Sequence, residues 1–243
     1  MGDPGWRAKY VERFYRSRPG WIDGTTEFHG MLRRHIAGGA RVLEIGSGSG
    51  NPTSAFLATI TPDLVGLEVA VPTAANAFVR GTCLYDGLRL PFRSQVFDAA
   101  VSNYVLEHVE HPEDLCGEVH RVLRRGGVFV FRTPNLCHYV SLAGRVMPHW
   151  ITRWLANWLR ALPEGSHEPH RTYYRMNAPG RIRRLLTSTG FEIAELTLVE
   201  KEPSYGLRSR VLFLAFLAYE RVVNSSRLFQ RLRANLFCVA RRP

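Results

Sequence analysis

The sequence predicts an α/β protein built on a mostly parallel sheet, with helices on both faces and a helical, aromatic cap over it. Short apolar runs alternate with helix-like segments at the spacing of βαβ units. A glycine-rich loop follows the first complete apolar run, at the strand end where such sheets bind ligands. The chain has 243 residues, of which 45% are hydrophobic. A chain of this size can bury a core without disulfides.

The first half of the chain carries clear start and stop signals. Thr25 is expected to cap a helix that Gly38 and Gly39 end. The run 41–45 is typical of a strand buried on both faces, and Asn51–Pro52 are typical of the cap and first residue of a helix. In order, we expect helices at 4–18 and 25–37, a strand at 41–45, a helix at 51–59, a strand at 64–68, a helix from Pro72 and a strand at 97–102.

The second half continues this alternation, with one interruption. Residues 136–179 are rich in His, Trp, Tyr and Pro and break the βα rhythm, so we expect them to form an insertion over the sheet. The other elements expected are a helix at 112–124, a strand at 128–132, a helix at 179–189, a strand at 191–199, a helix at 208–232 and a strand at 235–240.

Positive charge is concentrated at the C-terminal end. The formal net charge is +11, and residues 203–243 hold eight arginines against one acid, Glu220. The nine-residue apolar run 211–219 lies among them. We expect residues 208–233 to contact an anionic partner, either a membrane surface or a lipid-linked molecule. The alternative is a buried helix whose arginines are solvated. Nucleic acid is not expected, since no aromatic-and-basic motif accompanies the arginines.

The remaining composition favours a cytoplasmic chain. Residues 1–18 are polar and charged, without the apolar core of a signal peptide. The four cysteines lie far apart and form no CxxC or Cys/His pattern, so neither a metal site nor a disulfide framework is expected. Contact with the inner face of the membrane would follow from the basic segment. The oligomeric state is left open.

The glycine loop runs from Glu44 to Asn51 and reads EIGSGSGN. Glycines permit a tight turn and let a ligand approach the backbone closely. Free amides at the start of the following helix would favour a carboxylate or phosphate. A plain strand-to-helix turn is the alternative. A dinucleotide fingerprint would need a glycine at position 51, where this chain has Asn51.

Five segments in register resemble the class I S-adenosylmethionine-dependent methyltransferases, and most closely the small-molecule subgroup that includes ubiquinone and menaquinone methylases. These segments are the ExGxGxG loop, an acid ending the second strand (Glu68), Asp86 before Leu90-Pro91-Phe92, Leu106-Glu-His-Val109 after the fourth strand, and Arg121-Val-Leu followed by Gly126-Gly127. The resemblance implies a Rossmann-like, doubly wound seven-stranded sheet and S-adenosylmethionine as cofactor. It also implies one domain over 1–243, divided into an N-terminal helical segment (1–39), a cofactor-binding core (40–135), a substrate cap (136–179) and a C-terminal part with the basic apolar helix (180–243).

The resemblance also implies roles for single residues. Glu68 would accept hydrogen bonds from the ribose and Asp86 from adenine. A base is needed only for a weak nucleophile such as a hydroxyl, and His138 and His170 are the candidates. The cofactor-binding set is Glu44, Gly46, Ser47, Gly48, Gly50, Glu68, Val69, Asp86, Gly87, Asn103 and Tyr104. The substrate set is Tyr104, His108, His138, Tyr139 and Tyr173, and no metal ligand is expected.

The predicted function is methyl transfer by in-line displacement to a small-molecule or lipid-linked acceptor, at oxygen or carbon. Base methylases of nucleic acids carry a proline-rich loop after the fourth strand, where this chain has Ser102-Asn-Tyr-Val105. Two alternatives remain open: a protein that binds the cofactor without catalysis, and a nicotinamide-dependent oxidoreductase. The latter would lack its third fingerprint glycine.

Overall fold

The computed structural model describes residues 5–139, 141–142, 171–201 and 209–243. The chain divides into two compact units. The sheet unit comprises 28–134, 171–197 and 235–243, and the helical unit comprises 1–27, 135–170 and 198–234.

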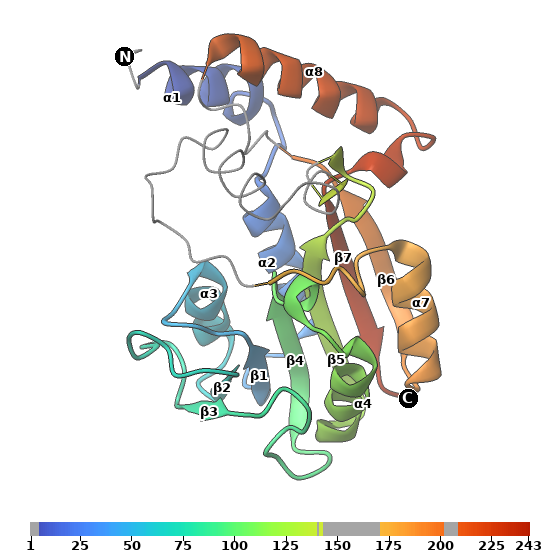
Figure 1. Cartoon of the computed structure of the whole chain (residues 1–243). Helices are drawn as coiled ribbons and strands as arrows, with labels where there is room; N and C mark the ends of the chain where they lie inside the picture. Colours follow the sequence, from blue (N-terminus) through green and yellow to red (C-terminus); the bar gives the residue numbers. More distant parts are fainter. Residues whose placement is uncertain (1–4, 140, 143–170, 202–208) are drawn as a thin grey trace. The chain divides into compact units, whose positions relative to one another are not determined.

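The sheet has seven strands in the order β3-β2-β1-β4-β5-β7-β6 (Figure 1). Strands β1 to β5 pair in parallel, and β7 runs antiparallel to β5. The predicted seven-stranded, mostly parallel α/β fold is therefore confirmed. The strands are β1 (Val42–Ile45), β2 (Leu64–Glu68), β3 (Thr82–Leu84), β4 (Phe97–Asn103), β5 (Leu123–Pro134), β6 (Glu192–Val199) and β7 (Asn235–Arg241).

Helices α2 (Gly24–His35), α3 (Pro52–Ile60), α4 (Pro112–Val122) and α7 (Pro179–Ser188) accompany the sheet (Figure 1). Helix α2 contacts α3 through His29, whose ring stacks on Phe56 with 4.3 Å between centroids. Helix α4 contacts α7. The buried residues of α4, which include Leu115, Val119 and Val122, recur at helical spacing, so one face of the helix packs inward.

The central strands are buried on both faces, which requires helices on both sides of the sheet. All four residues of β1 are buried, as are Val128 to Thr133 of β5. Strands with apolar side chains on both faces are stable only where helices cover both faces. Two charged residues are exceptions, since Glu44 in β1 and Arg132 in β5 also lie in these buried parts.

Two local predictions were wrong. No helix follows Pro72, and residues 69–81 form turns. There the side-chain amide of Asn76 donates to the Ser47 carbonyl at 3.1 Å, and its Oδ1 accepts from the backbone amide of Phe78 at 3.0 Å. Such local polar bonds compete with a helix. Thr25 does not cap α2, because the Asp23 carboxylate accepts from the amides of Thr25 and Thr26.

The helical unit contains α1 (Gly5–Val11), the π-helical turn η1 (Glu12–Arg16), α8 (Arg210–Ser225) and the 3-10 turn η3 (Gln230–Leu232). The single helix predicted over 208–232 therefore ends at Ser225. Helix α1 lies beside α8 (Figure 1), and an apolar cluster of Trp6, Tyr15, Phe213 and Leu217 joins α1 and η1 to α8. Within the described ranges, every helix is too short or too polar to cross a membrane.

Candidate functional site

The glycine loop joins β1 to α3 and requires glycine for two different reasons. Gly46, Gly48 and Gly50 all have positive φ, at 75°, 54° and 105°. At Gly46 a Cβ atom would overlap Cγ2 of Val105, so close packing forbids a side chain there. At Gly48 a Cβ atom would meet nothing within 4 Å, so this backbone faces open space. A ligand can approach the chain at Gly48.

Glu44 lies buried beneath the loop, at 1% exposure. Its Oε1 accepts from the Ser54 hydroxyl at 2.9 Å and from the Asn51 amide at 3.4 Å. Its Oε2 is buried and has no hydrogen-bond partner among the described residues. Burial raises the pKa of Glu44 to about 7. A buried carboxyl oxygen without a partner is costly, which fits a site that a ligand's donor group completes.

The start of α3 differs from the expectation of free amides. Asn51 is its N-cap, as predicted, and its Oδ1 accepts from the amides of Thr53 at 2.8 Å and Ser54 at 3.2 Å. These two donors are therefore already satisfied within the chain. The expectation of an anion site at the start of this helix was wrong.

Glu68 ends β2 beside the loop. Strands β1 and β2 pair in register, with Ile45 opposite Leu67, and this pairing brings the two strand ends together. The Gly48 amide donates to Oε1 of Glu68. Val69, which follows, is 64% exposed. The structure therefore brings the predicted loop glycines and the predicted ribose acid into one group.

Asp86 follows β3 and is exposed. Its Oδ1 accepts from the amides of Arg89 at 2.8 Å and Leu88 at 2.9 Å, and these bonds lower the pKa of Asp86. Gly87 next to it has a φ of 84°. Asp86 thus closes a turn. Its adenine contact stays a prediction.

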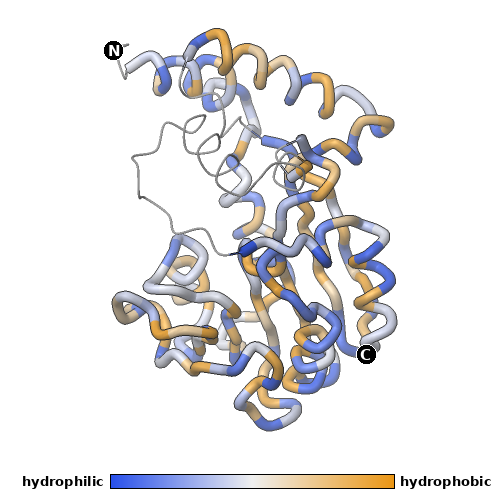
Figure 2. Tube along the Cα trace, viewed as in Figure 1, coloured by the Kyte–Doolittle hydropathy of each residue, from blue (hydrophilic) through white to orange (hydrophobic). Residues whose placement is uncertain are grey.

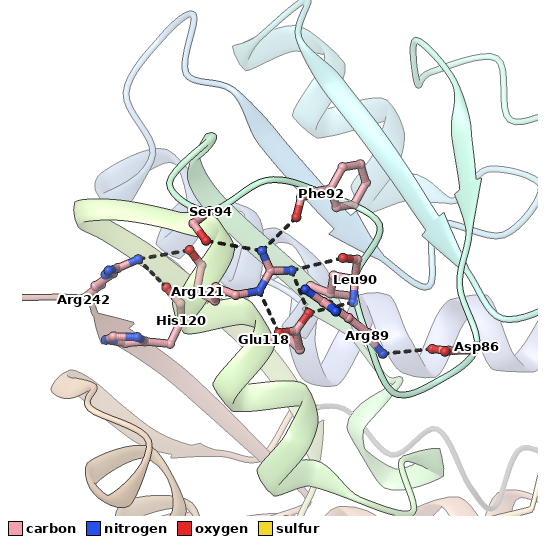
Figure 3. A network of polar contacts seen from close by, with 9 residues as sticks. All are labelled: Asp86, Arg89, Leu90, Phe92, Ser94, Glu118, His120, Arg121 and Arg242. Carbon is pink, nitrogen blue, oxygen red and sulfur yellow. Dashed lines mark hydrogen bonds and ion pairs between the residues drawn. The ribbon is translucent and has the colours of Figure 1, made fainter.

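Helix α4 holds the Leu90-Pro-Phe92 segment in place (Figure 3). Arg121 donates to the carbonyls of Phe92 at 2.8 Å and Leu90 at 3.1 Å. Glu118 pairs with Arg121 at 2.7 Å and accepts from the Leu90 amide at 2.8 Å. Segment 90–92 and the motif that starts at Arg121 were both singled out in the sequence, and the structure shows that Glu118 and Arg121 join them.

Asn103 and Tyr104, at the end of β4, belong to a polar chain. Asn103 donates to the Thr53 hydroxyl at 3.0 Å and accepts from Nε of Arg132. The Arg132 guanidinium lies 4.7 Å from the centre of the Tyr104 ring. Tyr104 has a φ of 57°, which is rare for an aromatic residue, and donates to Asn235 at 2.9 Å. Arg132 was not among the predicted site residues, although a charged residue within an apolar strand run was a usable signal.

Glu107, in the 3-10 turn η2 (Leu106–His108), forms a second buried polar group. Its carboxyl accepts from the Thr133 hydroxyl at 3.1 Å, and burial raises the pKa of Glu107 to about 7. Its carbonyl accepts from the Tyr173 amide at 2.8 Å. His108 Nδ1 lies 2.9 Å from the Arg171 carbonyl. The predicted substrate residues His108 and Tyr173 are thus held close to Glu107.

His138 and Tyr139 lie in the helical unit. His138 is 5% exposed, with its Nε2 3.7 Å from the Glu200 carboxylate, and burial lowers the pKa of His138 to about 4. Tyr139 stacks on Phe216 at 5.4 Å. His170 and most of the predicted cap, residues 140 and 143–170, lie outside the described residues. The roles of both histidines and the cap stay predictions.

Metal ligands were not expected from the sequence. In the part of the chain that the structure describes, no three His, Cys, Asp or Glu side chains are grouped as a metal site.

Comparisons with known proteins match this architecture. Residues 43–131 match the family described as "Methyltransferase domain". An uncharacterised protein of Methanocaldococcus jannaschii is 38% identical over 128 residues, which is 50% of this chain and 58% of that protein. A ubiquinone biosynthesis O-methyltransferase of Maricaulis maris is 24% identical over 203 residues, covering 79% and 74%. The chain thus spans little more than half of the first relative.

A solved structure shares the fold. Geranyl diphosphate C-methyltransferase from Streptomyces coelicolor aligns over 90% of this chain and 79% of that one, with a TM-score of 0.59 and 16% identity. The strand order, the glycine loop with Glu68 beside it, and the domain match agree. Residues 43–131 therefore form a methyltransferase domain, and the sheet around it has the fold of the class I S-adenosylmethionine-dependent methyltransferases.

Proposed function

We propose that this chain transfers a methyl group from S-adenosylmethionine to a small-molecule or lipid-linked acceptor, at oxygen or carbon. The observation that carries the proposal is the open backbone at Gly48, hydrogen-bonded to the acid that ends β2. An open glycine backbone beside a strand-end acid suits a nucleoside cofactor. The acid can accept hydrogen bonds from the ribose, and the amino-acid part of the cofactor can lie close to the loop.

The residues of the sheet unit fit the cofactor. Glu68 would bind the ribose, and Val69, Asp86 and Gly87 would border the adenine. Oε2 of buried Glu44, which has no hydrogen-bond partner among the described residues, would accept from a donor group at the amino-acid end of the cofactor. Gly46, Ser47 and Gly50 would shape the loop that lies against this end. Asn103 and Tyr104, fixed by Thr53 and Arg132, would border the same end. When bound, the cofactor supplies a methyl group on a sulfonium, which a nucleophile takes by in-line displacement.

The chain's own contribution is then alignment, exclusion of water and, for a hydroxyl acceptor, removal of a proton. A histidine with a lowered pKa is neutral at pH 7, which is the form that a base requires. His138 meets this condition, since burial lowers its pKa to about 4. A pKa this low also makes His138 a weak base at pH 7, so its role as base rests on the sequence alone. We keep His138 and His170 as the proposed bases, and Tyr104, His108, Tyr139 and Tyr173 as the proposed acceptor contacts, with 136–179 as the cap of a single domain.

The relatives support the acceptor class. The Maricaulis protein is named for O-methylation in ubiquinone biosynthesis, and the Streptomyces enzyme is named for C-methylation of geranyl diphosphate. Both names refer to small or lipid-like molecules, but to different methylated atoms. We therefore propose a small-molecule or lipid-linked acceptor for a cytoplasmic chain. An oxidoreductase is disfavoured, because Asn51 at the third fingerprint position caps α3.

Titration calorimetry with S-adenosylhomocysteine tests the cofactor assignment. Glu68→Ala removes a charged acceptor and should weaken binding about tenfold to a hundredfold. Glu192→Ala removes an exposed acid at the start of β6 and serves as the matched control. Equal affinity of the Glu68 variant and the wild type would overturn the ribose assignment.

The acceptor needs a separate experiment. Mass spectrometry of a deletion strain should reveal a metabolite or lipid that is lighter by one methylene than in the wild type. Cofactor binding together with an unchanged metabolite and lipid profile would favour the alternative of a binding protein without catalysis.

A further inference from the structure

The outward face of α8 is apolar. Between residues 211 and 222, its exposed positions are Val211, Leu214, Ala215, Ala218 and Val222, which recur at helical spacing along one side. The exposed polar residues of α8, Arg210, Asn224 and Ser225, lie at its two ends. Val211 is 77% exposed, Leu214 41% and Val222 53%. This stripe is about 17 Å long. A surface helix normally presents polar residues outward, so a stripe without a single polar side chain calls for an explanation.

A second exposed apolar group follows the helix. Leu228 is 85% exposed, and Phe229 and Leu232 are 41% exposed each. The Tyr219 hydroxyl donates to the Leu232 carbonyl at 2.6 Å, which holds η3 against α8. Figure 2 shows apolar segments along α8 and in the segment after it. We call α8 together with residues 226–233 the α8–η3 surface.

The charge on this surface has one sign. Arg210, Arg227 and Arg231 are exposed and form no ion pair within the described ranges of the chain. The only acid between 209 and 234 is Glu220, which is 5% exposed and bonded to Tyr15 at 3.3 Å and Asn224 at 2.8 Å. The α8–η3 surface thus combines apolar side chains and cations with no exposed carboxylate.

The other two arginines between residues 209 and 234, Arg221 and Arg233, already have partners within the chain. Arg221 donates to the Phe14 carbonyl at 3.0 Å and pairs with Glu220. Arg233 donates to the Leu198 carbonyl at 3.0 Å. Among the residues that the structure describes, the arginines at 210, 227 and 231 therefore have no ion pair and can contact an outside partner.

We propose that the α8–η3 surface binds an anionic lipid membrane. Aliphatic residues would enter the boundary between headgroups and acyl chains, and the three exposed arginines would meet lipid phosphates. A second copy of this chain fits less well, because a symmetric contact would bring like-charged arginines together with no acid to offset them. A nucleic acid fits less well, because the stripe on α8 is wholly aliphatic and Phe229 is the one exposed aromatic ring of the α8–η3 surface.

Co-sedimentation of the full chain with vesicles tests the proposal. Phosphatidylcholine vesicles containing phosphatidylglycerol should pull the chain down at low salt and release it at high salt, because salt screens the charge term. Pure phosphatidylcholine vesicles should not. Equal binding to both, or to neither, would overturn the proposal.

Variants separate this surface from overall charge. Changing the three exposed arginines together to Gln should weaken partitioning by roughly two orders of magnitude at low salt. The matched control makes the same change at three exposed arginines of α7, and should shift partitioning by less than about threefold. An equal loss in both variants would overturn the assignment. The control positions are Arg181, Arg183 and Arg184.

Further outcomes keep the test decisive. Val211→Ser with Leu228→Ser should weaken binding although the charge is unchanged, because both side chains are exposed in this structure. Light scattering should show the same mass for wild type and variants. If the wild type is a dimer and the serine variant is a monomer, the surface binds a second copy of the chain, and the proposal is overturned. Calorimetry with S-adenosylhomocysteine should be unaltered in every variant, so a failed membrane test leaves the proposed methyl transfer standing.

Discussion

Three buried ionisable residues set the electrostatics of this chain. Burial raises the pKa of Glu44 and Glu107 to about 7 and lowers the pKa of His138 to about 4. Between pH 4.5 and 7 both glutamates are therefore mostly protonated where an exposed glutamate is charged, and between pH 4 and 6.5 His138 is mostly neutral where an exposed histidine is charged. Such shifts concentrate at functional sites, and both glutamates belong to the sheet unit that holds the glycine loop.

Glu107 gives the fold a pH dependence with a definite sign. Its pKa is raised from 4.5 to about 7 on folding, so the folded chain holds a proton between these values that the unfolded chain has lost. Stability therefore falls as pH rises through this window, by at most about 3 kcal/mol for this group. Glu44 adds to the fall with the same sign, and His138 opposes it, since its stability contribution is lost as pH falls from 6.5 towards 4.

Glu107→Gln should remove part of this fall. Glutamine is neutral at every pH and can still accept from the Thr133 hydroxyl. We expect the variant to lose about 1–3 kcal/mol less than the wild type between pH 5 and pH 8, as measured by urea unfolding. Parallel losses in both proteins would show that Glu107 does not titrate in this range.

At this scale the sequence predicted the residues whose roles depend on local geometry. The loop glycines have the positive φ that their pattern implied, and Glu68 lies beside them. Arg132 and Asn76 were not foreseen, because their bonds join residues 29 positions apart in the chain. Local patterns carry no information about such partners.

Among the elements, buried strands were the most predictable. Strands β1, β2, β4 and β5 are recognisable in the sequence as largely apolar runs, because both of their faces are covered. Strand β3 has only three residues, none fully buried, and lies at the sheet edge, so it leaves no apolar run. The helix expected from Pro72 failed because the side chain of Asn76 binds the glycine loop.

Asn76→Ala tests that last contact. The variant loses the bonds to the Ser47 carbonyl and the Ser54 hydroxyl, which lie at 3.1 and 3.3 Å from the Asn76 amide. We expect about 1–3 kcal/mol of destabilisation in urea unfolding, because buried partners lose their donor. We also expect weaker binding of S-adenosylhomocysteine, because the loop is less preorganised.

The two readouts distinguish two roles for Asn76. Destabilisation with unchanged affinity would mean that Asn76 supports the fold without positioning the loop. Loss of affinity in a chain that unfolds like the wild type at the titration temperature would mean that it orders the binding loop directly.

For the whole molecule, the alternation of apolar runs and helix-like segments predicted an α/β chain and the charge distribution a basic C-terminal part, and the structure separates these features. The sheet unit holds the glycine loop and the strand-end residues. The helical unit holds α8, whose arginines and aliphatic stripe form a distinct surface. The sequence could not decide whether the outward side of α8 is apolar, because the helix is apolar nearly all round and only its packing against Trp6 and Tyr15 fixes which side is buried.

The central claim is that the loop after β1 binds S-adenosylmethionine. Titration calorimetry of the full wild-type chain with this cofactor tests it most directly. The account predicts saturable binding at one site per chain, weakened about tenfold to a hundredfold by Glu68→Ala and unaffected by Glu192→Ala. A folded chain that shows no saturable binding, or equal binding in all three proteins, would contradict it.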